Sequence, residues 1–357
     1  MLTHKGKDMN EDIRSLNIAE IEAVLGDLGE PAYRARQLFA WLHAKMAASY
    51  DEMSNLPKSL RETLAQTYPL APLEIVQKLT SKLDGTEKYL FRLADGHVIE
   101  SVRMLYSYGA SVCISTQVGC RMGCRFCAST LDGMERDLTA GEMLEQVYRI
   151  ERESGQRVSH VVLMGSGEPL DNMDNVLRFL RLITAEEGQN LSMRNITVST
   201  CGLVPEIRML AKEAFPITLA VSLHAPTDEK RREIMPIANK YPLSELIAAC
   251  RDYFAATGRR VTFEYALVAG QNDRDADARQ LAHLLDGFPA HVNLIPVNPI
   301  KERGYAPPGR SAVADFHKML EKYGINSTIR RGMGADIEGA CGQLRKRYKE
   351  QDREIEA

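Results

Sequence analysis

The chain has 357 residues and a formal net charge of −3, with 44% hydrophobic and 26% charged residues. These values are typical of an ordinary globular protein, and the length allows a large barrel-like domain with a smaller one beside it. No apolar run approaches the roughly 18 residues that cross a bilayer. The first twenty residues are charged and lack an apolar signal core. We therefore expect a cytoplasmic protein without membrane contact.

The net charge and the cysteine content further limit the class of protein to which this chain can belong. A net charge of −3 excludes a surface that is basic all over, so any nucleic-acid contact must come from local patches. The seven cysteines are unevenly spaced, which does not predict a disulfide framework. A reducing compartment fits this pattern.

Residues 1–72 are predicted to be helical. An amphipathic run begins at Asn17 or Ile18 and ends near Gly26–Gly29, and Pro31 then suits the first turn of a second helix. A third helix is expected over about 58–67. We interpret this region as an accessory domain.

Residues 73–105 are predicted to form a small antiparallel sheet. The pairs Asp84-Gly85 and Asp95-Gly96 are hairpin signals between β-rich runs. This sheet would link the helical domain to the rest of the chain.

Residues 106–345 alternate between predicted strands and helices, which is typical of an α/β protein with a parallel sheet. Six such β/α units are fewer than a closed eight-stranded barrel needs, so we expect a partial (βα)6 barrel. A further short strand (325–330) and a charged tail (346–357) follow. The predicted strands are 111–116, 158–164, 194–200, 217–223, 260–267 and 290–296, and the clearest helices are 139–153, 172–185, 243–257 and 273–286.

The most informative motif is the triplet Cys120, Cys124 and Cys127, spaced CxxxCxxC. Three thiolates can hold three irons of a [4Fe–4S] cluster and leave the fourth iron open for another ligand. The alternative is a zinc site, but structural zinc usually takes four ligands in paired units, and no second pair follows here. The spacing favours the cluster.

Several polar segments follow predicted strands and should therefore meet at one rim, because barrel ligands bind at the carboxyl ends of the strands. Taken singly, Ser199 suits a helix cap and His224 suits a structural histidine. The segments are the cysteine triplet, Gly165–Pro169, Ser199–Thr200, Ser222–His224 and Asn298.

The triplet and these segments resemble the radical S-adenosylmethionine (AdoMet) enzymes. The resemblance implies a [4Fe–4S] cluster on the triplet and AdoMet chelated to its open iron. It also implies that Gly167-Glu168 meets the amino group of AdoMet, where Ser166 replaces the first glycine of the family's usual pair. The other AdoMet contacts implied are Ser199, Ser222, Leu223, His224 and Asn298.

Two further cysteines, Cys113 and Cys341, sharpen the resemblance. With VCISTQVGCRMGCRFC, VSLHAP and HVNLIPVNP they make the chain similar to the dual-specificity 23S rRNA and tRNA adenine carbon-2 methyltransferases. The resemblance implies that Cys341 carries the methyl group, that Cys113 resolves the protein–RNA adduct by forming a disulfide, and that Glu100 is the general base. Cys201 and Cys250 match no role and suit packing.

By the same resemblance the partners are 23S rRNA, at an adenosine of the peptidyl transferase region, and tRNA, at the adenosine on the 3′ side of the anticodon. The target base must leave its stack. The chain is expected to be a monomer served by an electron donor such as flavodoxin. Arg259-Arg260, Arg330-Arg331 and Arg345-Lys346-Arg347 are candidate RNA patches, although a solvated charge cluster is the favoured interpretation of each.

Three alternatives stay open. A relative that methylates carbon 8 of the same rRNA adenosine and confers antibiotic resistance shares the triplet and both accessory cysteines, and only Pro169 favours carbon 2. A radical AdoMet enzyme acting on a protein or a small molecule would have no use for the Cys113 and Cys341 pair. A non-catalytic RNA-binding protein would hold a fully ligated metal.

Overall fold

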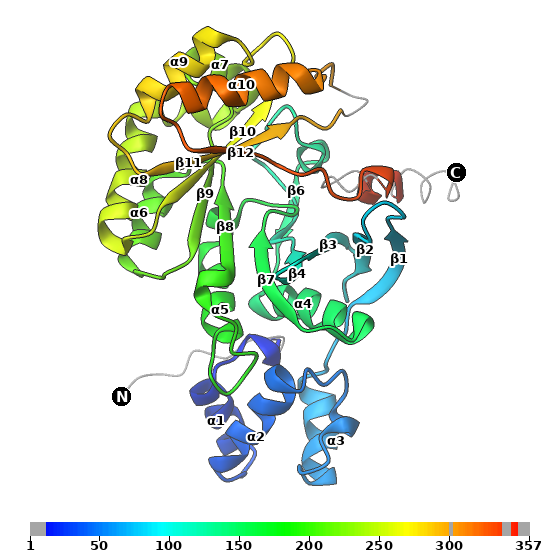
Figure 1. Cartoon of the computed structure of the whole chain (residues 1–357). Helices are drawn as coiled ribbons and strands as arrows, with labels where there is room; N and C mark the ends of the chain where they lie inside the picture. The colour runs from blue at the N-terminus through cyan, green and yellow to red at the C-terminus, as the bar shows by residue number, and fades with distance from the viewer. Residues whose placement is uncertain (1–11, 300–302, 338–343, 349–357) are drawn as a thin grey trace.

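The computed structural model describes residues 12–299, 303–337 and 344–348, and its centre is a ten-stranded mixed sheet (Figure 1). From β1 to β4 neighbouring strands run antiparallel, and from β4 to β12 they run parallel. The strand order is β1-β2-β3-β4-β7-β8-β9-β10-β11-β12, and β5 pairs with β6 in a separate two-stranded sheet.

The strands confirm the predicted β/α alternation. The six predicted barrel strands correspond to β4 and β7 to β11, and β12 is the further short strand. The bounds are β1 (Glu74–Thr80), β2 (Glu87–Arg92), β3 (Val98–Tyr106), β4 (Gly109–Cys113), β5 (Gln117–Gly119), β6 (Met134–Asp137), β7 (Val158–Leu163), β8 (Ile196–Thr200), β9 (Thr218–Ser222), β10 (Val261–Leu267), β11 (Ala290–Pro296) and β12 (Ser327–Ile329).

The helices flank this sheet or form the N-terminal part of the molecule. None of the helices in the described part of the chain has the length and apolar character that a membrane span requires. The bounds are α1 (Ile18–Asp27), α2 (Tyr33–Phe39), α3 (Lys58–Thr67), α4 (Ala140–Ser154), α5 (Met173–Ile183), α6 (Val204–Lys212), α7 (Asp228–Ile234), α8 (Leu243–Thr257), α9 (Asp275–Leu284) and α10 (Arg310–Lys322).

Local signals account for several helix ends. Asn17 caps α1, and its side chain and that of Glu20 bond to each other's backbone N–H groups in a capping box. Gly155 ends α4 in the left-handed conformation that favours glycine. Pro31 was expected in the first turn of α2, but the helix begins at Tyr33, so this proline precedes it.

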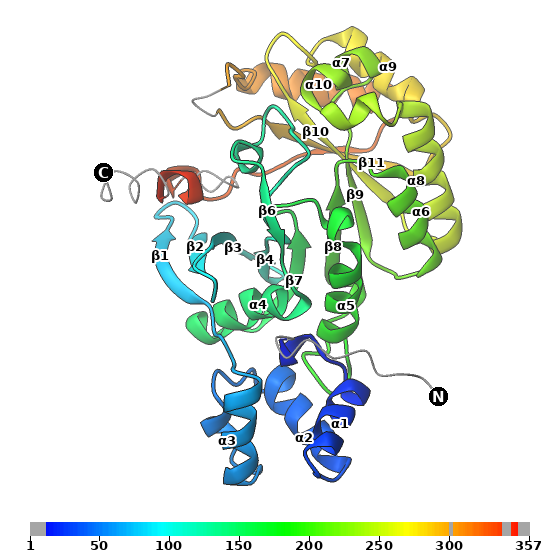
Figure 2. The same cartoon turned by 180° about the vertical axis from the view of Figure 1, so that it is seen from behind.

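The antiparallel strands predicted for 73–105 are present, and they continue the barrel sheet. β3 pairs with β4, with Val102 opposite Cys113. The barrel therefore gains three strands on its β4 side, as Figures 1 and 2 show.

Each barrel strand presents alternate side chains to the outer helices and to the inside of the barrel. On β10 the Phe263 ring lies 6.0 Å from that of Phe288, and Tyr265 stacks at 5.6 Å on Phe316 of α10. Glu264, between them, points to the opposite face. We call this opposite, concave face of the sheet the lumen face.

A close backbone approach fixes the segment after β7. The Gly165 N–H donates to Ile114 O at 3.0 Å. A Cβ at this position would lie 2.5 Å from Ile114 O and 2.8 Å from Ser115 N, both backbone atoms. Gly165 is therefore required by space, and it holds the segment against the chain that follows β4.

A buried polar interface joins the N-terminal helices to α4. Arg14 lies 3.5 Å from Glu145, and each side chain is 2% exposed. His43 Nδ1 lies 3.0 Å from the Tyr148 hydroxyl. Because buried charges are costly unless paired, this interface fixes how the accessory helices sit on the core.

We predict acid-sensitive stability at this interface. Burial, and then the charge of Arg14, lower the pKa of His43 from 6.5 to about 3, so its ring is neutral in the folded protein. Between these values the unfolded chain binds a proton that the folded chain does not, so stability falls as pH falls through this window. When the pH is lowered from 7 to 5, the free energy of unfolding should fall in both proteins, but by about 2 kcal/mol less in His43→Leu than in the wild type. Equal losses in urea unfolding of the two proteins would contradict this.

A second prediction concerns Gly165. Gly165→Ala should lower the free energy of unfolding by about 1–3 kcal/mol, because the added methyl group meets backbone that cannot move aside. The matched control is Gly26→Ala in α1, where a Cβ meets nothing within 4 Å. The control should be neutral or stabilise by up to about 1 kcal/mol. Urea unfolding measures both, and a neutral Gly165→Ala would contradict the close approach.

Candidate active site

The predicted polar segments meet at one edge of the sheet. β4 and β7 to β11 run parallel, so their carboxyl ends lie on the same rim. The cysteine triplet follows β4 and β5, and Gly165–Pro169 follows β7. Ser199 and Ser222 lie in the ends of β8 and β9, and Asn298 follows β11.

The triplet lies in the loop between β5 and β6. The Cys120 N–H donates to Gly133 O at 2.8 Å, and the Thr130 hydroxyl donates to Cys124 O at 3.1 Å and to Cys127 O at 2.9 Å. These bonds wrap the loop and bring the three thiols close together. The charge of the neighbouring thiols therefore contributes to the raised pKa of Cys120 and of Cys124.

The donor set of this loop fits an iron–sulfur cluster. Burial, followed by the charge of neighbouring Cys127, raises the pKa of Cys120 to about 12, and burial raises the pKa of Cys124 well above 9. Buried thiols ionise when they bind metal, and cluster ligation takes thiolates. No three His, Cys, Asp or Glu side chains in the described ranges converge on one point as ligands of a single ion would. Thiolates that bind three different irons do not need such convergence.

Glu168 is buried at the rim and its carboxylate is held from two sides. Its Oε1 accepts from the Leu170 N–H at 3.1 Å, and its Oε2 accepts from the Cys201 N–H at 2.7 Å. Burial raises the pKa of this carboxyl, and the bonds from backbone and side chains oppose that rise. Gly167 has φ +109° and passes so close to Gln117 that a Cβ would lie 2.7 Å from its backbone N.

His224 is a neutral acceptor. Its Nδ1 accepts from the Ala266 N–H at 2.9 Å, so the ring proton sits on Nε2. Burial, and then the charge of Arg231, lower its pKa to about 3. The ring meets Phe126 of the cysteine loop edge-on at 4.6 Å, and the backbone has φ +58°, uncommon outside glycine. His224 therefore lies beside the triplet in a constrained conformation.

The other predicted AdoMet contacts differ in exposure. Ser199 and Ser222 are half-buried on the lumen face, Leu223 is buried, and Asn298 is exposed. The N–H groups of Leu223 and His224 both donate to Glu264 O, at 3.0 and 3.2 Å. This ties the end of β9 to β10.

Cys113 faces the lumen from β4. It is 5% exposed and packs with Val102 and Met104 of β3 and with Val162 and Met164 beside it. The thiol therefore sits in an apolar wall.

Glu100, on the same face of β3, is 3% exposed. Its Oε2 lies 3.3 Å from Nζ of the fully buried Lys88 on β2, and its Oε1 accepts from the Arg345 N–H. The buried ammonium offsets the cost of burying the Glu100 charge.

Cys341 lies outside the described residues, but the chain on both sides of it is placed. On the near side Asp336 accepts from the Ser81 hydroxyl at 2.6 Å. On the far side Leu344 packs with Leu90 and Val98. Both flanks contact the strands β1 to β3 or the turn between them, next to Glu100.

The predicted arginine patches lie at different ends of the barrel strands. Arg259 and Arg260 precede β10 and so lie at the opposite end from the triplet, whereas Arg330 and Arg331 follow β12 at the triplet's end. Arg345 is 4% exposed and binds Glu135 of β6 at 2.6 Å. It is therefore an internal ion pair, and the prediction that it belongs to a solvated or RNA-binding patch is wrong.

Sequence reasoning missed Gln146 and Arg231. Gln146 Oε1 accepts from the Ser115 N–H and the Ser101 hydroxyl, both at 2.8 Å. The Arg231 guanidinium donates to Cys201 O at 2.7 Å and to the carbonyls that end β9. Nothing in their local sequence marks them, because their partners come from other elements.

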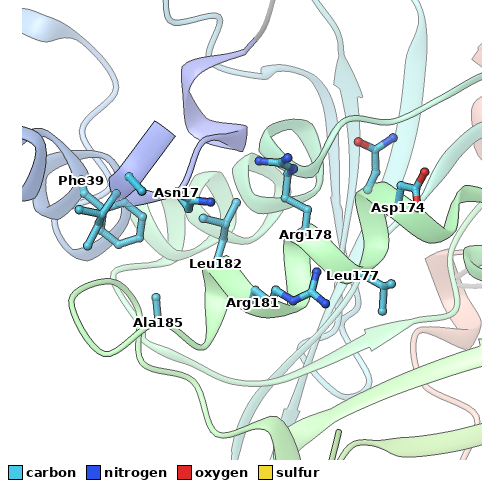
Figure 3. Close-up of a pocket in the computed structure, with 11 residues that line it drawn as sticks. Asn17, Phe39, Asp174, Leu177, Arg178, Arg181, Leu182 and Ala185 are labelled. Atoms are coloured by element: carbon cyan, nitrogen blue, oxygen red, sulfur yellow. The ribbon is translucent and has the colours of Figure 1, made fainter. Parts of the chain in front are cut away.

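A cavity of about 800 Å³ lies between the N-terminal helices and α5 (Figure 3). Its polar lining includes Asn17, Arg178 and Arg181. Arg178 is paired with Glu20 at 2.6 Å and Arg181 with Glu213 at 2.5 Å. None of the predicted site residues lines it.

Comparison with known proteins bears on this site. The model described as the radical SAM superfamily matches residues 114–282, and the model described as the ribosomal RNA large subunit methyltransferase N-terminal domain matches residues 11–69. A crystal structure of a radical SAM methyltransferase from Sphaerobacter thermophilus superposes with a TM-score of 0.89 at 48% identity, covering 93% of this chain and 98% of the other.

Two curated relatives also match this chain over nearly its full length. The probable dual-specificity RNA methyltransferase RlmN of Lachnospira eligens is 57% identical, covering 95% of this chain and 97% of the relative. That of Lachnoclostridium phytofermentans is 56% identical, covering 94% and 95%. On this similarity, the chain belongs to the RlmN family of radical SAM methyltransferases.

Proposed function

We propose that this enzyme methylates carbon 2 of an adenosine in 23S rRNA and in tRNA by way of a methylated Cys341. The relatives named above support RNA as the substrate. The observation that carries the proposal is the shared lumen face of Glu100 and Cys113, which lie on the adjacent strands β3 and β4 beside the anchored flanks of Cys341.

The cofactors are a [4Fe–4S] cluster and AdoMet, as in the radical SAM superfamily. Cys120, Cys124 and Cys127 would hold the cluster, and Gly167, Glu168, Ser199, Ser222, Leu223, His224 and Asn298 would hold AdoMet. When bound, they supply a methyl group and a carbon radical that can abstract hydrogen. This chemistry suits carbon 2 of adenine, an electron-poor carbon that cannot attack a methyl group as a nucleophile.

The protein's own groups then have three tasks. The Cys341 sulfur accepts the methyl group. After a hydrogen atom is abstracted from this methyl group, the methyl carbon bonds to carbon 2 of the adenine. The resulting adduct has to lose one electron, which an oxidised cluster on the cysteine triplet could accept, and Glu100, which is paired with Lys88, takes the proton from carbon 2 of the adenine. Cys113 attacks the Cys341 sulfur, the bond between that sulfur and the methylene carbon breaks, and the carbon takes up a proton to become the methyl group of the released RNA. A disulfide is left between the two cysteines.

The substrate must present an adenine outside its stack, and RNA would be held by its shape and phosphates. The N-terminal helices and Arg330-Arg331 are the surfaces we propose for that contact. We further propose a monomer in the cytoplasm, reduced by a donor such as flavodoxin.

The proposal is tested with AdoMet that carries a trideuterated methyl group. The reconstituted enzyme is given 23S rRNA fragments or tRNA without oxygen, and the digested nucleosides are analysed by mass spectrometry. The expected product is 2-methyladenosine with two deuteriums, because one deuterium is abstracted. A methyl group with all three deuteriums would contradict the radical route, and 8-methyladenosine would assign the chain to the carbon-8 reaction.

A second prediction isolates the release step. Cys113→Ala should stall after carbon–carbon bond formation and accumulate a covalent protein–RNA adduct, visible as a nuclease-sensitive band shift on a denaturing gel. The matched control is Cys250→Ala, a buried thiol on α8 away from the lumen. This control should turn over without adduct. Turnover by Cys113→Ala at the wild-type rate would remove Cys113 from the mechanism.

A further inference from the structure

Arg231 of α7 is a fully buried cation without a carboxylate partner. Its side chain is 0% exposed. Its Nε donates to Leu223 O at 3.2 Å, and its Nη2 donates to Cys201 O at 2.7 Å and to Ser222 O at 3.2 Å. Among the residues that the structure describes, no Asp or Glu forms an ion pair with it, and its buried Nη1 has no hydrogen-bond partner. The carbonyl groups accept hydrogen bonds but leave the positive charge uncancelled.

The groups that can supply the missing negative charge are thiols. A buried charge is costly unless an anion lies nearby. Burial lowers the pKa of the Arg231 guanidinium, and the negative charge that Cys201 and then Cys124 carry when ionised opposes this fall. Burial raises the pKa of Cys124, and the charge of Arg231 acts in the opposite direction. Arg231 is therefore in electrostatic contact with one thiol of the cysteine triplet.

Backbone contacts hold α7 against the loop that carries the triplet. The N–H of Arg125, next to Cys124 in the chain, donates at 2.9 Å to the carbonyl of Ile234, the last residue of α7. One position before Cys124, a Cβ on Gly123 would lie 3.3 Å from Pro236 Cγ, just beyond the helix. Arg231 lies about one helical turn before Ile234. Its guanidinium is thus fixed beside the loop and away from solvent.

We propose that Arg231 is the buried counter-ion of the iron–sulfur cluster and raises the reduction potential of that cluster. This rests on the cluster site proposed above. A cluster with three thiolates is an anion, and reduction by one electron adds a further negative charge. A fixed cation in surroundings of low dielectric constant attracts the reduced form more strongly than the oxidised form. A given one-electron donor therefore reduces a larger fraction of the clusters when Arg231 is present.

The two arginines of the loop itself are less suited to this role. Arg121 and Arg125 are exposed, and Arg121 is paired with Asp171. Water and salt screen exposed charges, so each contributes less to the potential than a buried charge does. The burial of Arg231 is what makes its charge effective.

The reduction potential is measured on the holoenzyme without AdoMet, without RNA and without turnover. The cluster is reconstituted without oxygen and titrated with dithionite in the presence of redox mediators, and the electron paramagnetic resonance signal of the reduced cluster is recorded at each potential. Arg231→Met removes the charge and keeps an unbranched side chain. At a fixed potential, the ratio of reduced to oxidised cluster should fall about ten- to a hundredfold relative to the wild type, and each tenfold change is a shift of about 59 mV for one electron.

Two further variants separate the charge from the hydrogen bonds. Arg231→Lys keeps the charge but loses the planar fork of donors, and its ratio should stay within about threefold of the wild type. Arg231→Gln is a second neutral variant, which should behave as Arg231→Met does and which serves if Arg231→Met fails to fold. A purely structural role predicts instead that Arg231→Lys and Arg231→Gln behave alike, because both lose bonds to the carbonyl groups.

The matched control is Arg232→Gln. Arg232 is the next residue of α7 and its side chain is exposed. The substitution removes the same charge from the same helix, but from a position that water and salt screen. The ratio of reduced to oxidised cluster should change by less than about threefold.

Three results would overturn the inference. A wild-type potential in both neutral variants would reduce Arg231 to a donor for the strand ends. An equal fall in Arg231→Lys and Arg231→Gln would assign the effect to the lost hydrogen bonds. An equal fall in Arg232→Gln would show that burial of the charge does not matter. If the wild-type protein assembles no cluster, the proposed function itself fails, which is a separate outcome.

Discussion

The register of the antiparallel ladder between β3 and β4 decides where the accessory residues stand. With Val102 opposite Cys113, the side chains of Glu100, Val102 and Cys113 all reach the lumen face. A slip of one residue would turn the β3 set to the other side of the sheet. The ladder also ends the parallel sheet with strands that the C-terminal segment can contact. Glu100, Cys113 and the flanks of Cys341 thus depend on one pairing.

Polar groups buried behind the rim keep the strand ends in place. Gln146 bonds to both Ser101 and Ser115, and Arg231 bonds to carbonyls at the ends of β8 and β9. Those carbonyls lie where the ladder stops, so strand neighbours do not satisfy them. A buried guanidinium with several acceptors satisfies them at once, and a neutral side chain there would leave them without donors. The strand ends at the rim are therefore held in place by hydrogen bonds from Gln146 and Arg231.

The sequence was sufficient for whatever depends on local pattern. The cysteine spacing, the β/α alternation and the rule that ligands gather at strand ends predicted the rim without a structure. It was insufficient where partners are distant in the chain. Lys88 beside Glu100 and Arg345 beside Glu135 are pairs of this kind, and a run of charges such as Arg345-Lys346-Arg347 looks solvated until one member is found buried. Glu264 was overlooked because its strand is buried on both faces, which hides the alternation that marks an amphipathic strand.

The surroundings of Cys113 on the lumen face differ from those of Glu264. On the β3, β4 and β7 side, thioethers and aliphatic groups surround Cys113. On the β9 to β12 side, Glu264, Asn293 and Thr328 form a hydrogen-bonded row. The hydrogen-bonded polar side chains of β10 to β12 and the apolar surroundings of the Cys113 thiol therefore lie on different strands of the lumen face. A primary carbon radical can abstract hydrogen from many neighbouring groups. The molecule that carries it must therefore be positioned against its target by contacts away from the reacting carbon.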